Sequence, residues 1–202
     1  MAARTQRSSG GSPPFATGAI GGAVSFVAGY LLTLVVVAVI ETEDSSENLV
    51  EFAGWLYYNA QFVAVESSVD GGGVGFGAQM SEVNYLTDGG ASQTFDAPVI
   101  LYHLIPVLVL FVGGYAIARS ADARELQEGA IAGATVALGA VVVALLGTFV
   151  FSFSVSGVTF SPVLVEGVLL AGIVFPGLLG AAGGAVSTQV GSSQQQQRRR
   201  PR

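Results

Sequence analysis

The segment from Pro98 to Ser120, PVILYHLIPVLVLFVGGYAIARS, constrains the fold more than any other part of the chain. The 22 residues from Ala97 to Ala118 carry no formal charge. At about 1.5 Å of rise per residue, a helix of this length crosses the roughly 30 Å hydrocarbon core of a membrane. The same segment contains the single histidine of the chain, His103. We therefore expect a transmembrane helix and an integral membrane protein.

The composition agrees with this expectation. Of the 202 residues, 51% are hydrophobic and only 11% are charged, whereas about a quarter of the residues of a soluble domain carry a charge. A single membrane-embedded domain is the simplest organisation. The chain has no cysteine, which excludes disulfides, thiolate metal sites and cysteine nucleophiles.

Three further apolar runs predict three further spans, about 15–40, 129–151 and 160–187. For the first run the alternative is a cleaved signal peptide, but the run is longer than the 7 to 15 apolar residues of a signal sequence. The uncharged stretch from Gly129 to Val165 is too long for one helix, and we expect a turn at 152–157 and a new helix opening at Ser161-Pro162. The predicted fold class is therefore an all-α membrane bundle of four transmembrane helices.

The basic residues predict the orientation of these four helices. All eight are arginine, and they lie in three segments: residues 1–14, the short loop after the second span, and residues 188–202. We expect the N-terminal and C-terminal segments to be disordered tails. The eight arginines are Arg4, Arg7, Arg119, Arg124, Arg198, Arg199, Arg200 and Arg202. Four spans place all of them on one side, and the positive-inside rule makes this side, with both termini, cytoplasmic. The acidic segment 41–96 is then extracellular.

The charge balance also indicates a source. The chain has no lysine, and its fourteen acidic residues give a net charge of −6. This balance resembles that of proteins from extreme halophiles, in which acidic exposed segments stay hydrated in strong salt.

The extracellular segment includes an apolar stretch, 52–65, that is too short to span. Its Trp55, Tyr57 and Tyr58 suit a membrane–water boundary, where the ring is buried and its polar edge stays wet. The stretch could form an interfacial or re-entrant helix on the mouth of the bundle, or a small helix in an extramembrane domain. Its length does not distinguish between these two alternatives. Alternation along 74–80 predicts a short strand, and a second run through Val83 and Tyr85 predicts its return as a hairpin.

Small residues recur at helical spacing in three of the spans. Examples are Gly18 with Gly22, Gly129 with Gly133, and Gly180 with Gly184. In lipid, such residues let helix backbones approach closely. They predict close packing within the chain, with a homo-oligomer as the alternative.

Two ionisable residues lie inside the predicted spans, His103 in the second and Glu166 in the fourth. Each is about six residues from the outer end of its helix, which places both roughly 9 Å below the outer boundary. Such residues are either structural, joining helices by hydrogen bonds, or part of a transport or proton-handling site. Enzymatic chemistry is disfavoured, because the single histidine has no positioned nucleophile and no cluster of metal ligands with which to form a catalytic site.

Two stretches resemble a group of haloarchaeal multi-pass membrane proteins of uncharacterised function, some of which carry a loose transporter label. They are Gly54-Trp55-Leu56-Tyr57-Tyr58-Asn59-Ala60-Gln61-Phe62-Val63 and Tyr102-His103-Leu104-Ile105-Pro106. The resemblance implies a source and a membrane location, and it implies no catalytic residue.

We expect a structural or accessory membrane component that is not an enzyme and that uses no metal or cofactor. The alternative is a small transporter or channel subunit using His103 and Glu166. The expected partners are the lipid bilayer and a second copy or another membrane protein. Four arginines at the C-terminus are too few to indicate nucleic-acid binding.

Overall fold

The computed structural model describes residues 14–40, 48–69, 78–88 and 96–198. Within these ranges, four helical stretches are long and apolar enough to cross a membrane. They are Phe15–Ile40, Val99–Ser120, Leu126–Val150 and Leu164–Val190. The prediction of four helices of spanning length is confirmed.

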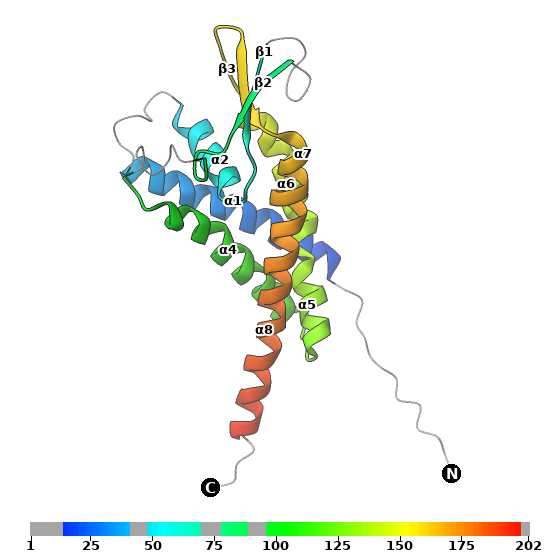
Figure 1. The fold of residues 1–202 in the computed structure, drawn as a ribbon. Coiled ribbons are helices and arrows are strands. Elements are labelled where there is room, and N and C mark those ends of the chain that lie inside the picture. Colours follow the sequence, from blue (N-terminus) through cyan, green and yellow to red (C-terminus); the bar gives the residue numbers. More distant parts are fainter. Residues whose placement is uncertain (1–13, 41–47, 70–77, 89–95, 199–202) are drawn as a thin grey trace, which may run out of the picture.

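The first two spans are single helices, α1 (Phe15–Ile40) and α4 (Val99–Ser120). The third consists of α5 (Leu126–Ala134) and α6 (Val136–Val150), separated at Thr135. The Thr135 hydroxyl donates a hydrogen bond to the Ala132 carbonyl, a local bond that competes with the regular helical ladder. In Figure 1, α8 stands nearly upright while α1 and α4 cross the picture at a steep angle to it.

The fourth span has three parts, a single turn α7 (Leu164–Glu166), the π-helix η1 (Gly167–Val174) and α8 (Phe175–Arg198). The change from π- to α-helix comes one residue before Pro176, whose missing N–H interrupts the hydrogen-bond ladder. Helix α8 continues to Arg198, although the sequence predicts an end near Ser187 and a disordered tail. The predicted helix end is wrong because serine and glutamine continue a helix and no proline lies between Ser187 and Pro201.

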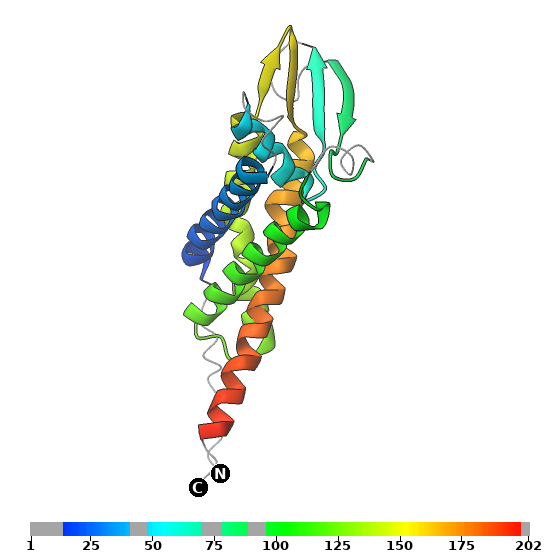
Figure 2. The ribbon, with the colours of Figure 1, turned by 90° about the vertical axis from the view of Figure 1, so that its left-hand side faces the viewer.

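Beyond one end of the helices lies a four-stranded antiparallel sheet with the strand order β2-β1-β4-β3 (Figure 2). Its strands are β1 (Val65–Val69), β2 (Ala78–Val83), β3 (Phe153–Val155) and β4 (Val158–Pro162). The central pair joins β1, from the segment between the first two spans, to β4, from the turn between the last two. The all-α fold class is therefore incomplete, since it omits a sheet built from two distant parts of the chain.

The predicted turn at 152–157 is part of a hairpin. Ser156 and Gly157 connect β3 to β4 with φ angles of 51° and 78°, as in the two-residue turns whose twist matches that of the strands. The predicted helix opening at Ser161-Pro162 is wrong, because both residues belong to β4 and the helix begins at Leu164. Pro162 ends the strand, where a missing N–H is tolerated.

The predicted hairpin in the acidic segment is only partly correct. Of the predicted strand 74–80, residues 74–77 lie outside the described part of the chain, and β2 (Ala78–Val83) begins within the predicted strand and extends beyond it. No strand returns through Tyr85. Instead the Asn84 amide donates to Asp88 Oδ2 at 2.7 Å and the Leu86 amide donates to Asn84 Oδ1 at 3.0 Å, which closes a turn. Short polar side chains favour such turns by bonding to nearby backbone.

Close backbone contacts at glycines hold the four spans together. On the α1–α6 side, a Cβ added to Gly22 would overlap the Val136 carbonyl. On the α5–α8 side, one added to Gly129 would overlap the Gly184 carbonyl. The predicted close packing of helices thus occurs within the chain, by backbone contact that only glycine permits.

Candidate functional site

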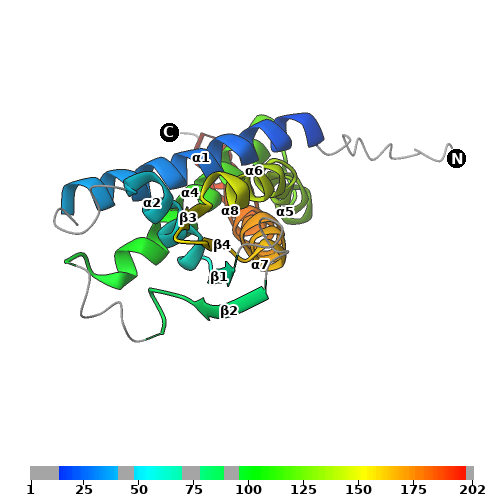
Figure 3. The same cartoon turned by 90° about the horizontal axis from the view of Figure 1, so that it is seen from above.

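Helix α2 (Leu49–Asn59) runs into the bundle, and the chain then reverses through residues 60–64 to β1 (Figure 1). The sequence predicts a longer helix, 52–65, whereas Val65 already belongs to the sheet. Two glycines allow α2 to pack closely against its neighbours, since Gly29 of α1 lies against the Tyr57 ring and Gly54 of α2 lies against the Phe151 ring. Seen from above, α2 lies beside α1 and beneath the sheet (Figure 3). We call residues 60–64 the return loop.

The return loop closes α2 with a Schellman turn. The Val63 amide donates to the Tyr58 carbonyl at 3.1 Å, and the Phe62 amide donates to the Asn59 carbonyl at 2.9 Å. In this motif one residue adopts the left-handed conformation, and it is usually glycine. Here it is Phe62, with φ of 62°. A bulky residue in that conformation is strained by about 1–2 kcal/mol.

His103 of α4 holds the first residue of the return loop. Its Nδ1 lies 2.9 Å from the Ala60 carbonyl oxygen, and because a carbonyl only accepts, Nδ1 is the donor. The last carbonyls of a helix have no partner within the helix. His103 thus supplies a hydrogen bond that water would supply at an exposed helix end.

Glu166 of α7 holds the last residue of the loop. The Ala64 amide donates to its Oε2 at 2.8 Å, and the Ala64 carbonyl accepts a bond of 2.9 Å from the Val163 amide. Among the described residues, no hydrogen bond or ion pair joins Glu166 to His103. The structure therefore brings the two predicted residues to opposite ends of one loop, where each binds backbone.

Two asparagines that the sequence analysis did not single out complete these contacts. Asn59 donates through Nδ2 to the Val63 carbonyl at 2.7 Å and accepts from the Tyr85 amide at 3.0 Å. Asn84 donates through Nδ2 to the Asn59 carbonyl at 3.2 Å. Both side chains are buried. One sequence feature could have indicated their role, namely an amide side chain at the end of an apolar helical stretch, which is typical of a helix cap or turn.

The three predicted interfacial aromatics have different surroundings. Trp55 is partly buried, donates through Nε1 to the Phe151 carbonyl at 2.6 Å, and stacks on Tyr85 with ring centroids 6.3 Å apart. Burial raises the pKa of the Tyr85 hydroxyl. Tyr57 and Tyr58 are fully buried, so the prediction that their polar edges stay wet is wrong for both, because α2 packs between α1 and α6.

The two buried tyrosines differ in their hydrogen bonding. The Tyr58 hydroxyl donates to the Ala144 carbonyl of α6. The Tyr57 hydroxyl, which lies against Gly29, has no hydrogen-bond partner within the described part of the chain. A buried polar group without a partner costs about 1–3 kcal/mol.

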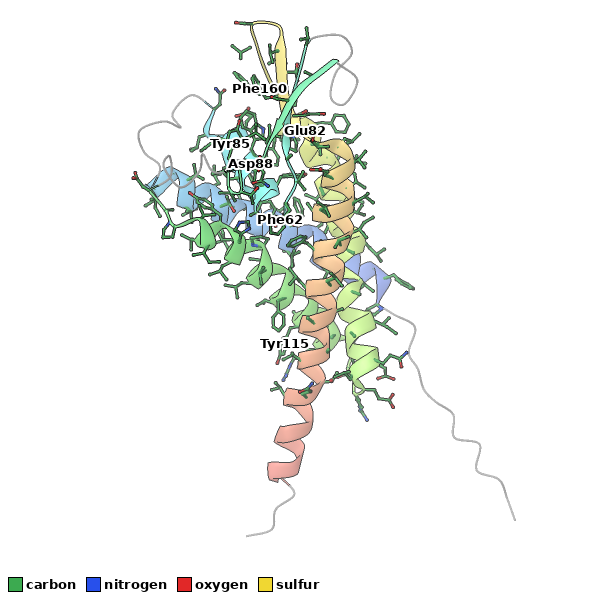
Figure 4. All side chains as sticks on the ribbon, viewed as in Figure 1. Phe62, Glu82, Tyr85, Asp88, Tyr115 and Phe160 are labelled. Carbon is green, nitrogen blue, oxygen red and sulfur yellow. The ribbon has the colours of Figure 1, made fainter. Side chains whose placement is uncertain are left out.

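Phe62 is the outward-facing residue of the return loop, with 55% of its surface exposed. Its ring stacks on the His103 imidazole, with centroids 5.3 Å apart and planes inclined by 24°, and lies 5.9 Å from the Phe175 ring. Figure 4 shows it in the angle between α4 and α8. The αL backbone of Phe62 and this exposed ring are features that the sequence analysis missed.

The predicted topology residues are only partly described. Arg119, in the last turn of α4, and Arg124, in the loop that follows, are exposed, and Arg119 Nη1 donates to the Tyr115 hydroxyl at 3.3 Å. The C-terminal end of α4 lies away from the sheet (Figure 1). Arg198 is the last residue of α8. Arg4, Arg7, Arg199, Arg200 and Arg202 lie outside the described residues. Within the described ranges, no group of three or more His, Asp or Glu side chains is placed to hold a metal ion.

Residues 1–191 match the model of a family of unknown function (DUF7978). The chain belongs to this family. No curated protein and no solved structure matches it. The family description names no activity, so any functional conclusion depends on the geometry of the return loop and on the sequence.

Proposed function

We propose that this DUF7978 member is a structural or accessory component of the cell membrane, with no enzymatic activity. In this proposal the four spans anchor the chain, and α2 with the return loop fixes the sheet on the extracellular side. One observation carries the proposal: His103 and Glu166 use their polar atoms to hold backbone groups of a single loop. In an apolar medium such groups must be satisfied within the protein, and this need explains both ionisable side chains without a transport pathway.

The orientation belongs to the same proposal. The C-terminal ends of α4 and α8 lie away from the sheet, and Arg119 is in the last turn of α4, which supports a cytoplasmic location for that end of the bundle and for both termini. The lack of lysine and the excess of acidic residues support a halophilic archaeal source. The partners would be lipid and a second copy or another membrane protein.

Cysteine labelling tests the orientation, because the natural chain has no cysteine. Ser156→Cys marks the β3–β4 turn and Asp122→Cys marks the loop between α4 and α5. On intact cells, a membrane-impermeant thiol reagent should label the first variant and should label the second only after lysis. Labelling of Asp122→Cys on intact cells, with Ser156→Cys protected, would overturn the topology.

Reconstitution into liposomes containing a pH-sensitive dye tests the role. We expect proton flux no greater than in empty liposomes at any pH, and we expect His103→Ala to lower the unfolding temperature. A pH-dependent flux in the native protein that disappears in His103→Ala would refute the structural role and would support the transporter or channel subunit.

A further inference from the structure

The return loop contains a feature that its structural role does not require. At the left-handed position of a Schellman turn, glycine would close α2 without strain. The chain has Phe62 there, with φ of 62°, and 55% of its surface is exposed. A strained residue with a largely exposed side chain gains little stability from packing. Strain of this kind is typically retained at functional sites.

The surroundings of Phe62 define what such a site would bind. Its ring lies against the His103 imidazole of the second span and near the Phe175 ring of the fourth. Phe175 lies near the middle of the fourth span, Leu164–Val190. An exposed ring at that depth meets the hydrocarbon layer rather than water, so a ligand would reach it from within the bilayer.

His103 supplies the polar contact. Its Nδ1 carries a hydrogen, since it donates to the Ala60 carbonyl at 2.9 Å. In the neutral imidazole the other nitrogen, Nε2, then offers a lone pair, and it has no hydrogen-bond partner in the described structure. An acceptor on a partly exposed side chain, beside a flat aromatic surface, suits a ring that carries a hydroxyl group.

We propose that Phe62, His103 and Phe175 form a binding site, open to the bilayer, for a quinol. Among molecules dissolved in a membrane, a quinol combines a flat ring, which stacks on Phe62 and Phe175, with a hydroxyl that donates to His103 Nε2. The site binds the ring without any covalent or redox step. It adds a ligand to the structural role and rests on the membrane placement given under the proposed function.

The test uses the full-length protein in lipid nanodiscs and duroquinol as the probe. Equilibrium dialysis, corrected with empty nanodiscs for partition into lipid, should give saturable binding with one duroquinol per chain. Durene has the same methylated ring without hydroxyls and should bind at least tenfold more weakly. The absence of saturable duroquinol binding, or equal binding of durene, would overturn the proposal.

Variants at position 62 localise the site. Phe62→Gly should weaken duroquinol binding at least tenfold while leaving the unfolding temperature unchanged or higher, because glycine relieves the strain. Phe62→Asn, which also accepts the left-handed conformation, provides a second folded variant with the same expected loss. Phe149→Leu is the matched control, an exposed ring on α6 (51% exposed) that should leave binding unchanged. Unchanged binding in both Phe62 variants would refute the site.

Discussion

The four apolar helices and the return loop satisfy their backbone hydrogen-bonding groups in different ways. Within the spans, backbone groups bond along each helix, and glycines such as Gly22 and Gly129 bring the helices together. At the return loop the helix ends inside the bundle, and His103 and Glu166 replace water. The first region thus depends on the absence of side-chain atoms and the second on specific polar atoms.

This difference predicts the largest effect at a glycine contact. A Cβ at Gly22 would overlap the Val136 carbonyl, so Gly22→Ala should lower the free energy of unfolding by about 3 kcal/mol, because two backbones must separate. At Gly177 a Cβ meets nothing within 4 Å, and Gly177→Ala should raise stability by up to about 1 kcal/mol. Reversible unfolding in mixed micelles measures both. Equal stabilities for the two variants would show that close packing does not hold the spans.

The second effect separates the acceptor role of Glu166 from its charge. Glu166→Ala leaves the Ala64 amide without its partner and should cost about 2 kcal/mol. Glu166→Gln keeps a side-chain oxygen at that position and should cost less than about 1 kcal/mol. The same unfolding measurement applies. A glutamine variant as unstable as the alanine variant would mean that the negative charge is required, as in an ion pair.

The smallest effects are expected at the two buried tyrosines, and they have opposite signs. Tyr58→Phe removes the bond to the Ala144 carbonyl and should cost about 1 kcal/mol. Tyr57→Phe removes a buried hydroxyl without a partner in the described structure and should be neutral or stabilising by about 1 kcal/mol. Thermal unfolding of the two variants side by side checks the signs. A loss in both would indicate that the Tyr57 hydroxyl has a partner in the membrane.

The apolar lengths predicted the four helices of spanning length because a bilayer sets one length for every helix that crosses it. The sheet was missed because its central pairing is non-local. Val65–Val69, VESSV, has little apolar alternation of its own, and its partner β4 comes much later in the chain. Ser161-Pro162 fits both a helix start and a strand end, and only the pairing with β1 decides between them.

The sequence indicated which residues belong to the candidate site but not which groups they contact. An ionisable side chain in an apolar run stands out in a sequence, so His103 and Glu166 could be selected. Their partners, the Ala60 carbonyl and the Ala64 amide, are backbone groups that need partners only because the chain reverses there. Asn59 and Phe62 were missed for the same reason, since the reversal depends on where α2 ends.

Backbone hydrogen exchange at Ala64, in the protein in nanodiscs, tests the central claim most directly. We expect slow exchange of this amide in the native chain and in Glu166→Gln, and exchange at least tenfold faster in Glu166→Ala, because only the alanine variant lacks the acceptor. Fast exchange in the native chain, or an unchanged rate in Glu166→Ala, would contradict the account in which the two ionisable side chains hold the return loop.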